Sequence, residues 1–504
     1  MKLTKLLERL EYKVVCGDAD VEVNTLLMDS RKVEAGDVFV CITGAVRDAH
    51  DFVDDVVEKG ARAIIIEKDV DVALASSKNV TVVKVESTRY ALACMAAAFY
   101  GYPAEKLKTI GITGTKGKTT TTYMVRSVLE GVGIKCGLIG TIETIIGDGT
   151  VIPSENTTPE SLLVQEYFAR MVEAGCQAVV MEVSSQGLMM DRVAGFTFDF
   201  GVFTNLSADH IGPNEHKDFE DYVACKAKLF KNCRHGIFNM DDEHVNEMLA
   251  HATCDLEFFG ENGKAKAEAA YIDKAVGKLS ASGVKLFTGP GVLGVSYTVS
   301  GNVNMPVEIC VPGDFSVYNS LAAISICLHF TQDKEKIESA LKNIRVKGRV
   351  EIVPVKDEYT LMIDYAHNAM SLESLLLSLK KYEHNRIVAL FGCGGNRDRN
   401  RRFEMGEISS KLADLTIVTS DNPRDEEPMA IIEDILVGVA KADGAYVTIP
   451  DRKDAIKYAI ENGQKGDIIV LAGKGHEDYQ IIKGTKYHMD ERELIAEIKQ
   501  ELGL

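Results

Sequence analysis

A glycine-rich turn between two segments of different periodicity constrains this chain most. Its sequence is Thr113-Gly114-Thr115-Lys116-Gly117-Lys118-Thr119-Thr120. Residues 109–112 are rich in β-branched side chains, as in a buried strand, and apolar residues in 123–129 recur at helical spacing. A strand, a glycine-rich turn and a helix in this order typically bind phosphate, because backbone N–H groups and the helix N-terminus attract the anion. Lys118 is expected to reach the outer phosphates of a nucleotide, and Thr119 to ligate Mg²⁺.

One position departs from the strict phosphate-loop pattern, which has glycine five residues before Gly117. Ile112 stands there, and the glycines fall at 111 and 114 instead. An isolated match of this kind can be an ordinary turn. The flanking strand and helix favour a nucleoside triphosphate site.

Length and composition limit the class of protein. A chain of 504 residues should form about three domains, which we place at 1–105, 106–345 and 346–504. A net charge of −18 argues against a nucleic-acid partner, because phosphate backbones are bound by basic surfaces. Eleven cysteines without CxxC pairs suggest reduced thiols in a cytoplasmic protein and make zinc an unfavoured cofactor. No apolar run approaches membrane-spanning length, so we expect no membrane association.

Two apolar segments of the central region end in polar loops. Residues 178–183 include Glu182, and residues 200–203 run into a loop that contains His210. In open parallel sheets ligands bind outside the carboxyl ends of the strands. Both side chains should therefore converge on the phosphate loop, where each could hold Mg²⁺ directly or through water.

Lys226 lies in the middle of an apolar helical stripe. Phe219, Tyr222, Leu229 and Phe230 share its face of the expected helix, whereas Lys228 points away. A buried ammonium is costly, so this lysine needs a partner or a chemical change. An amine beside metal ions could react with carbon dioxide to give a carbamate that ligates Mg²⁺. From the pattern alone, a snorkelling lysine or a buried ion pair is equally compatible.

The region from about Gly348 onward repeats one theme four times: an apolar strand followed by a polar loop. The loops begin near Asp364, Gly392, Asp421 and Gly473. Helical segments separate the strands, so we expect a second parallel sheet with convergent loops. Loops rich in Arg, Asn, Gly and Glu suit a zwitterionic ligand, because arginine binds carboxylates and glutamate binds ammonium groups.

Residues 1–105 have the pattern of a small α/β unit, with apolar strands expected at 37–42 and 61–66. Ser30 and Arg31 precede the first of these strands and supply a hydroxyl and a cation. Taken alone, they are more typical of a solvated turn than of a binding site.

Together these motifs resemble the Mur ligase family of bacterial peptidoglycan synthesis, over nearly the whole chain. Besides the phosphate loop, the resemblance rests on Asn156-Thr157-Thr158-Pro159, Glu182-Val183-Ser184-Ser185, Thr204-Asn205-Leu206-Ser207, Tyr318-Asn319, Gly348-Arg349, Asp364-Tyr365-Ala366-His367 and Gly473-Lys474-Gly475-His476-Glu477. It implies an α/β protein of three domains: a small N-terminal α/β UDP-binding domain, a central P-loop-type parallel-sheet ATPase domain and a C-terminal Rossmann-like domain. The family's altered phosphate loop also accounts for Ile112.

The resemblance implies a role for each matching position. Catalytic roles fall on Lys118, Lys226 and His210. Metal ligands would be Thr119, Glu182, His210 and Lys226 as its carbamate. ATP would be bound by Gly114, Thr115, Lys116, Gly117, Lys118, Thr119, Thr120, Asn319, Arg349 and Asp364. The UDP-muramoyl dipeptide would be bound by Ser30, Arg31, Thr157, Thr158, Ser184 and Arg192, and the amino acid by Arg397, Asp421, Asn422, Arg424, Gly473 and Glu477. Gln186 departs from the histidine that many members carry after the paired serines.

The implied reaction is an ATP-dependent amide ligation with two Mg²⁺ ions, through an acyl phosphate, in the cytoplasm. It adds an amino acid to UDP-N-acetylmuramoyl-L-alanyl-D-glutamate, and closure of the C-terminal domain would be part of turnover. A monomer is expected. Arg424 favours meso-diaminopimelate over L-lysine, because an arginine pairs with the extra carboxylate and repels the lysine ammonium.

Three alternatives are weaker. The same ligase could use L-lysine. A folylpolyglutamate synthetase-like ligase shares the central and C-terminal layout, but its phosphate loop lies much closer to the N-terminus. A catalytically silent nucleotide-binding regulator would be expected to lose the lysine or metal residues that this chain retains.

Overall fold

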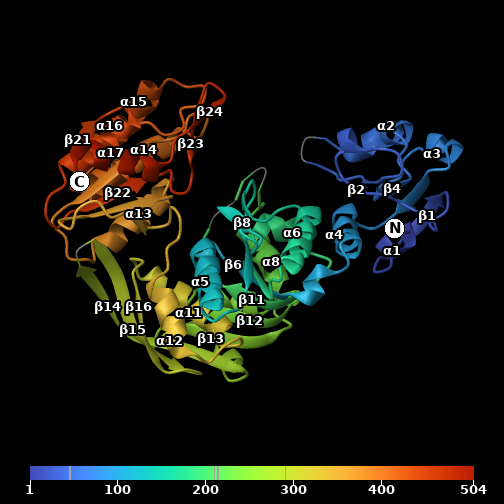
Figure 1. Cartoon of the computed structure of the whole chain (residues 1–504), viewed down its shortest axis with the longest axis horizontal. Helices are drawn as coiled ribbons and strands as arrows, with labels where there is room; N and C mark the ends of the chain where they lie inside the picture. Colours follow the sequence, from blue (N-terminus) through green and yellow to red (C-terminus); the bar gives the residue numbers. More distant parts are fainter. Residues whose placement is uncertain (45–46, 209–210, 213–214, 290) are drawn as a thin grey trace. The chain divides into compact units, whose positions relative to one another are not determined.

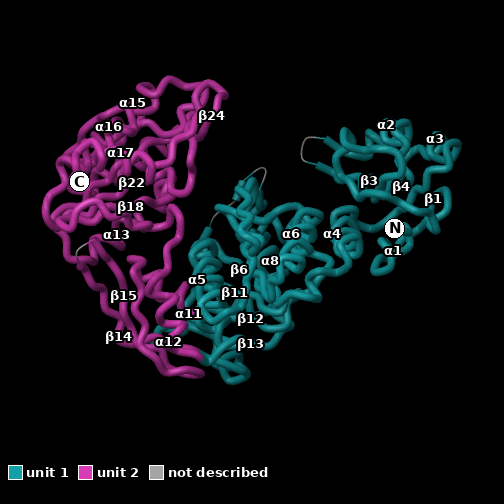
Figure 2. Tube along the Cα trace, in the orientation of Figure 1, with its two compact units in different colours: residues 1–278, 322–332 teal, residues 279–321, 333–504 magenta. Residues whose placement is uncertain are grey.

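The computed structural model describes residues 1–44, 47–208, 211–212, 215–289 and 291–504. It divides the chain into two compact units, shown in different colours in Figure 2. The first unit comprises residues 1–278 and 322–332, and the second comprises residues 279–321 and 333–504. The domain boundaries that we place after residues 105 and 345 stay predictions.

A five-stranded sheet of order β1-β5-β4-β3-β2 opens the first unit. All its neighbours are parallel except the edge strand β1, which pairs with β5 antiparallel. Its strands are β1 (Lys13–Cys16), β2 (Leu26–Leu27), β3 (Val38–Val40), β4 (Ala63–Ile66) and β5 (Thr81–Lys84). The accompanying helices are α1 (Leu3–Leu6), η1 (Ser30–Lys32), η2 (Ala49–Phe52), α2 (Val53–Glu58), α3 (Ala73–Ser77), α4 (Thr88–Phe99) and η3 (Pro103–Lys106).

The part of a larger sheet that lies in the same unit has the strand order β13-β12-β11-β6-β10-β7-β8-β9. The strands from β13 to β7 are parallel, and β8 and β9 extend the sheet antiparallel. The strands are β6 (Lys108–Thr113), β7 (Cys136–Ile139), β8 (Glu143–Ile145), β9 (Val151–Pro153), β10 (Ala178–Glu182), β11 (Phe198–Phe203), β12 (Cys233–Asn239) and β13 (Asp255–Glu261). The helices are α5 (Lys118–Gly131), α6 (Ser161–Glu173), α7 (Ser185–Met189), α8 (Phe219–Lys231), α9 (Val245–Leu249) and α10 (Ala269–Ile272) (Figure 1).

The position of β6 in this sheet explains where ligands can bind. β6 lies between β10 and β11, and its residues Ile110 and Ile112 are fully buried. The three strands run parallel, so their carboxyl ends open at one edge, where the phosphate loop follows β6. The residue at 112 is therefore a core strand residue, which explains why the loop carries no glycine there.

The second unit begins within β14 (Gly277–Gly289), which pairs antiparallel with β15 (Val292–Gly301), as β15 does with β16 (Met305–Ile309). α11 (Phe315–Cys327) begins in this unit, and α12 (Lys334–Lys342) follows. The sequence predicted none of these strands, because glycines at 283, 289, 291 and 294 interrupt the alternation of apolar residues on which a strand prediction depends.

A six-stranded sheet of order β17-β18-β22-β19-β20-β21 forms the rest of the second unit. It is parallel except at the edge strand β17. Its strands are β17 (Glu351–Ile352), β18 (Thr360–Asp364), β19 (Ile387–Phe391), β20 (Leu415–Val418), β21 (Ala445–Thr448) and β22 (Ile468–Ala472). The helices are α13 (Ala369–Leu379), α14 (Asn400–Leu412), α15 (Pro428–Val439), α16 (Arg452–Glu461) and α17 (Glu491–Leu502), and a hairpin of β23 (Tyr479–Ile482) and β24 (Thr485–His488) follows β22.

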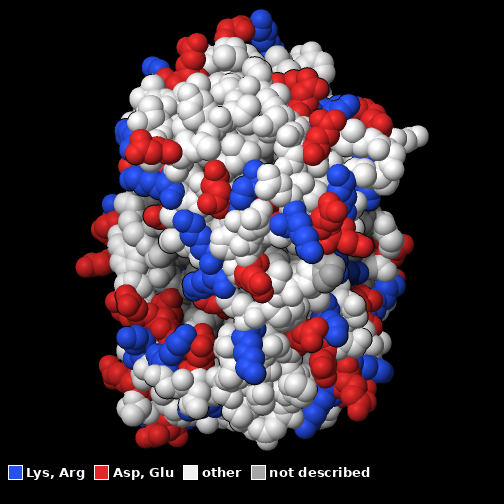
Figure 3. Space-filling model, turned by 90° about the vertical axis from the view of Figure 1, so that its left-hand side faces the viewer, with Lys and Arg blue, Asp and Glu red and all other residues white. Residues whose placement is uncertain are grey.

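The predicted α/β class with parallel sheets is confirmed, and the strands expected at 37–42, 61–66, 109–112, 178–183 and 200–203 are present with small shifts at their ends. The four strands expected before the loops at Asp364, Gly392, Asp421 and Gly473 are β18, β19, β20 and β22. The antiparallel additions make the larger sheet mixed. Among the described residues no helix combines the length and the apolar character that a membrane crossing requires. Figure 3 shows basic side chains interspersed with acidic ones, and the described residues on that face form no continuous basic patch.

Candidate active site

The phosphate loop needs glycine at two positions. Gly114 has φ +149° and Gly117 has φ +85°, both in the region that L side chains rarely adopt. A Cβ at Gly114 would lie 2.0 Å from Thr204 Oγ1 and 3.0 Å from the Asn205 carbonyl oxygen. The loop can therefore approach the segment after β11 only because residue 114 has no side chain.

The segment after β11 holds the loop in place. Thr115 N–H donates to the Asn205 carbonyl at 2.9 Å, and Lys116 N–H donates to Asn205 Oδ1 at 2.9 Å. Thr204 Oγ1 donates to the Lys116 carbonyl at 2.8 Å. These contacts occupy the outer side of the loop. Gly117 is the N-cap residue of α5 and makes no side-chain hydrogen bond to the first turn of this helix, whose N-terminus favours an anion.

Lys118 folds over the same loop. Its Nζ donates to the carbonyl oxygens of Gly114 at 2.9 Å and Thr115 at 3.1 Å. The ammonium therefore lies beside the uncapped N-terminus of α5. This placement suits the binding of nucleotide phosphates.

Thr119 and Glu182 meet below the loop as the sequence predicts. Thr119 Oγ1 donates to Glu182 Oε2 at 2.9 Å, and Glu182 is 1% exposed. Thr141, after β7, donates to the same carboxylate from its backbone N–H at 2.8 Å and its hydroxyl at 3.0 Å, and its Oγ1 lies 3.1 Å from Thr157 Oγ1. Hydroxyl and carboxylate oxygens form the donor set that Mg²⁺ prefers, so these residues fit that ion.

Lys226 reaches the phosphate loop from α8. It is 2% exposed, and its Nζ donates to the Gly114 carbonyl at 3.0 Å. The ammonium also lies 4.6 Å from the centroid of the Tyr222 ring, whose hydroxyl is 3.1 Å from Thr115 Oγ1. Lys228 is exposed. The predicted burial of the helix face that carries Lys226 is therefore confirmed. The Lys226 and Lys118 amines donate to the same carbonyl, that of Gly114, so both lie at the phosphate loop.

Residues predicted to bind the sugar peptide cluster beside Glu182. Thr158 Oγ1 accepts from Ser184 N–H at 2.9 Å and donates to the Glu182 carbonyl at 3.0 Å. Arg192 donates to the Thr158 carbonyl at 3.0 Å and to Glu160 at 2.5 Å. The structure thus brings Thr158, Ser184 and Arg192 together at the carboxyl end of β10.

Other predicted residues are not joined to this cluster. Ser30 and Arg31 lie in η1, where Arg31 is 86% exposed and pairs with Asp29 at 2.8 Å, lowering the pKa of that carboxyl to about 2. Asn319 lies in α11, in the second unit, where its buried Nδ2 has no hydrogen-bond partner among the described residues. His210 lies outside the described residues.

Arg349 and Asp364 come together in the second unit. Asp364 accepts backbone hydrogen bonds from Val350 and Ala366, each at 2.8 Å. Burial raises the pKa of this carboxyl, and the Arg349 guanidinium opposes that shift. The pair combines a planar cation with a buried carboxylate, which suits polar recognition of a nucleotide.

Aromatic rings surround Arg349. Its guanidinium lies 4.8 Å from the Tyr365 ring, which is 4.8 Å from the His476 ring. Burial, followed by the charge of Arg349, lowers the pKa of His476 to about 4. A Cβ at Gly348 would lie 2.1 Å from the Gly475 carbonyl carbon, so glycine permits this contact between two loops.

Lys474 connects the residues predicted to bind the amino acid. It is fully buried, and its Nζ donates to Asn422 Oδ1 at 2.8 Å and Glu477 Oε2 at 3.2 Å. Asp421 Oδ1 lies 3.7 Å from the same ammonium, and a Cβ at Gly473 would lie 3.0 Å from Asp421 Oδ2. The structure thus brings four of the predicted residues to one place at the ends of β20 and β22.

Arg424 adopts an unusual backbone conformation next to this network. Its φ is +52°, in the region that favours glycine, and its N–H donates to the Ile481 carbonyl at 2.9 Å. Its Nη1 donates to the Gly395 carbonyl at 2.7 Å. A Cβ at Gly394 would lie 2.7 Å from that nitrogen and 3.8 Å from Arg397 Cγ, so the two arginines flank one loop. Strain of this kind is typical of functional positions.

Sequence reasoning assigned no role to Lys474, Tyr222, Thr141, Thr204 or Asn205, although each contacts the predicted site. The sequence does carry a signal for a role of Lys474, since this residue follows a strand end within a glycine-rich loop. Thr141 gave no local signal, because the fold of the sheet alone brings β7 beside β10.

Comparison with known proteins supports the same reading. Three family models match the chain: "Mur ligase family, catalytic domain" at residues 22–100, "Mur ligase middle domain" at 112–327 and "Mur ligase, glutamate ligase domain" at 348–475. The chain is 43% identical to UDP-N-acetylmuramoyl-L-alanyl-D-glutamate--2,6-diaminopimelate ligase 1 of Clostridium acetobutylicum, over 100% of both chains. It is 41% identical to the corresponding ligase of Clostridium perfringens, over 99% of both.

Solved structures agree. A UDP-N-acetylmuramoyl-L-alanyl-D-glutamate--2,6-diaminopimelate ligase matches with a TM-score of 0.71 and 26% identity, over 100% of this chain and 99% of that one. Folylpolyglutamate synthase of Mycobacterium tuberculosis, complexed with ADP, matches 77% of this chain and 91% of its own, with a TM-score of 0.56 and 18% identity, which shows a shared fold alone. Full-length identity above 40% and three matching domains, together with the phosphate-loop geometry, lead to one conclusion: the chain belongs to the Mur ligase family.

Proposed function

We propose that this enzyme forms an amide bond between the D-glutamyl side-chain carboxylate of UDP-N-acetylmuramoyl-L-alanyl-D-glutamate and an amino group of meso-diaminopimelate, with ATP hydrolysed to ADP and phosphate. The observation that carries the proposal is the convergence of Lys118, Lys226 and the Thr119–Glu182 pair on one phosphate loop. Full-length relatives named as ligases of this dipeptide and 2,6-diaminopimelate support the choice of substrates. A place in cytoplasmic peptidoglycan precursor synthesis follows from the same proposal.

Charge neutralisation is the main catalytic task of the first unit. A substrate carboxylate and the γ-phosphate repel each other, and they must come together for an acyl phosphate to form. The N-terminus of α5 and the Lys118 ammonium would bind the phosphates. Thr119 and Glu182 would hold Mg²⁺, which supplies further positive charge when bound; His210 is proposed as a further ligand, and two ions as the full complement.

Lys226 is proposed to act as a carbamate. Its amine is buried, so an ammonium there is costly unless it is compensated. A carbamate would reverse the charge of the side chain and provide oxygen atoms as ligands for Mg²⁺. Its position 3.0 Å from the Gly114 carbonyl keeps the group at the edge of the phosphate loop.

Thr157, Thr158, Ser184 and Arg192 are proposed to bind the dipeptide end of the sugar substrate, and Ser30 and Arg31 its UDP end. The Arg192 guanidinium already contacts a carbonyl and a carboxylate, as a substrate peptide would offer. Asn319, Arg349 and Asp364 are proposed to contact the nucleotide.

The amino-acid pocket is proposed to lie in the second unit, around Lys474. Asn422 and Glu477 offer polar contacts to an ammonium, and Arg397 and Arg424 offer guanidinium groups to carboxylates. Meso-diaminopimelate has one more carboxylate than L-lysine. A strained backbone that fixes the Arg424 guanidinium would therefore favour diaminopimelate, since lysine leaves that cation without a partner.

Phosphate release in the presence of each substrate combination tests the function. We expect release to require both UDP-muramoyl dipeptide and meso-diaminopimelate, and to be much slower with L-lysine. Release with a folate and glutamate, or with no combination, would contradict the proposal and point to a folylpolyglutamate synthetase-like ligase or a silent nucleotide-binding protein, respectively.

Replacing Lys226 with alanine should lower kcat by a factor of about 10²–10³, because a group that binds charge at the reacting centre is lost. Added short-chain carboxylic acids should partly restore the rate by filling the place of the carbamate. Steady-state rates with and without acetate or propionate measure this, and Lys231→Ala at the exposed end of the same helix is the control. An alanine variant with the wild-type rate would rule out the role.

Replacing Arg424 with alanine should raise the KM for meso-diaminopimelate by at least about tenfold and leave the KM for ATP nearly unchanged. Lys483→Ala, in the neighbouring hairpin, is the matched loss of a positive charge. Equal changes in both KM values would show that the amino-acid pocket is wrongly placed.

His476 should govern part of the acid sensitivity of the second unit. Its folded pKa of about 4 lies below the ordinary value of 6.5, so the unfolded chain binds the proton more tightly and stability falls as the pH drops from 6.5 toward 4. In NMR titrations we expect the His476 imidazole to titrate near pH 4, and Arg349→Met to move the midpoint upward, because the charge of Arg349 is the largest cause after burial. The exposed His488→Asn variant should leave it unchanged. An ordinary midpoint in the unsubstituted protein would refute the burial of this ring.

A further inference from the structure

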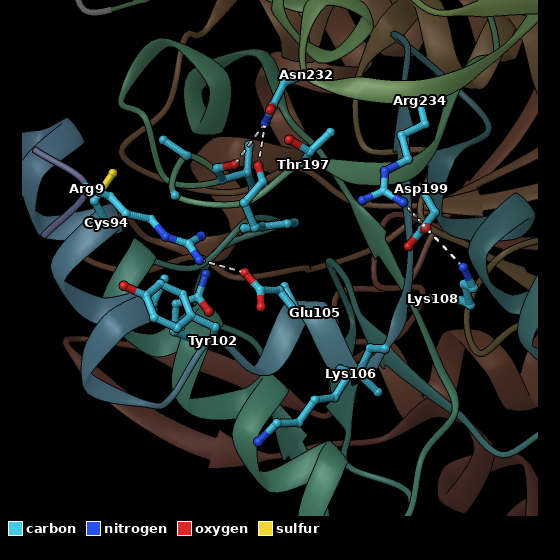
Figure 4. Close-up of a pocket in the computed structure, with 18 of the residues that line it drawn as sticks. Arg9, Cys94, Tyr102, Glu105, Lys106, Lys108, Thr197, Asp199, Asn232 and Arg234 are labelled. Atoms are coloured by element: carbon cyan, nitrogen blue, oxygen red, sulfur yellow. Dashed lines mark hydrogen bonds and ion pairs between the residues drawn. The ribbon is translucent and has the colours of Figure 1, made fainter.

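A cavity of about 790 Å³ lies in the first unit, away from the phosphate loop (Figure 4). Its lining includes Lys108 and Asp199 at the start of β6 and β11, and Arg234 at the start of β12. The phosphate loop follows the opposite, carboxyl ends of these strands. The cavity is therefore separate from the candidate active site, and its size is that of sites for small molecules.

One wall of the cavity contains a close contact between a loop and a helix. Gly195, with φ +84°, would place a Cβ 2.6 Å from the Ala93 carbonyl of α4, so the loop after α7 packs directly on that helix. Asp191 in the same loop has φ +51°, a conformation that aspartate and asparagine tolerate better than most residues. This geometry fixes Asp191 in the lining of the cavity.

Two acceptor groups of the lining lack donors. Gln165 is 1% exposed, and its Oε1 is buried without a hydrogen-bond partner among the described residues. The half-buried Asp191 carboxylate has neither a side-chain hydrogen bond nor an ion pair in the described part of the chain, and burial raises its pKa although the charges of Lys228 and Arg89 act in the opposite direction. Buried polar groups are normally paired, so the Gln165 amide oxygen calls for a group that donates a hydrogen bond, and the Asp191 carboxylate can accept from such a group, for example an ammonium.

Two arginines approach the cavity from opposite walls. In Figure 4 the Arg9 side chain, from the turn after α1, and the Arg234 side chain, from β12, extend toward the space between them. Arg9 pairs with Glu105 at 2.8 Å. Arg234 comes only within 3.8 Å of Asp199, and that carboxylate already accepts from the Thr109 N–H at 2.9 Å. The Arg234 guanidinium is therefore suited to bind a second carboxylate.

We propose that this cavity binds a small zwitterion of the amino-acid class, with its ammonium at Asp191 and Gln165 and its carboxylate at Arg234. A ligand with both charges satisfies acceptors and donors that neither a simple anion nor a simple cation could satisfy together. The site is independent of the proposed ligase function, because none of these residues belongs to the candidate active site.

Calorimetric titration of the full-length protein tests the site. The probes are the common L-amino acids, with 1,4-diaminobutane and succinate as matched ligands that carry only one kind of charge. Titrations are repeated in an Arg424→Ala background, which weakens the amino-acid pocket proposed for the ligase. We expect at least one amino acid to bind in both backgrounds, and diaminobutane and succinate to bind at least about tenfold more weakly.

Three cavity variants locate the ligand. Asp191→Asn keeps the size and backbone tolerance of the residue, Arg234→Gln removes an exposed charge, and Gln165→Leu replaces the buried amide. Each should weaken binding by at least about tenfold. Asp273→Asn, an exposed carboxylate outside the lining, should leave it unchanged.

The proposal is overturned if no amino acid binds in the Arg424→Ala background, if the cavity variants bind as the unsubstituted protein does, or if either single-charge ligand binds equally well. Failure of the ligase assay would not bear on it, because these titrations measure binding without turnover.

Discussion

The contact between the phosphate loop and the segment after β11 is the constraint on which the candidate active site depends. Gly114 lies where any side chain would collide with Thr204, and Asn205 pairs with the backbone on the outer side of the loop. These contacts fix the backbone of the loop, and the loop leads directly into the N-terminus of α5. Lys226 and Lys118 both donate to the Gly114 carbonyl, so one residue without a side chain sets the position of both amines.

Local charge at this site runs against the charge of the whole chain. The protein carries a formal charge of −18, yet the phosphate loop gathers two lysines and an uncapped helix N-terminus. Glu182 lies beside them as a buried carboxylate held by three hydrogen bonds. A triphosphate alone would repel that carboxylate, whereas a divalent cation between them would offset the repulsion of the two negative groups. The same geometry therefore favours a nucleotide and a metal ion together.

In the second unit a cation is buried, and hydrogen bonds compensate the free-energy cost of removing its charge from water. Lys474 is fully buried, but Asn422 and Glu477 accept hydrogen bonds from it. Removing one partner from such a network leaves an uncompensated charge, so its members act as a unit. Arg424 reaches the neighbouring loop from a strained backbone, and this combination of a rigid network and an aimed guanidinium suits discrimination between ligands that differ by one carboxylate.

The sequence by itself determined those elements that depend on interactions between residues close together in the chain. The strand before the phosphate loop, the helix after it and the apolar face that buries Lys226 follow from periodicity, because each depends on neighbours within a few residues. The resemblance of motifs to the Mur ligases pointed to the family, which the comparisons then established. Only the tertiary structure decided that Thr141 joins Glu182, that Lys474 connects the amino-acid loops, and that Gln165 and Asp191 line one cavity. These contacts join residues distant in the chain, so their energies depend on how strands and helices pack, and no local pattern records them.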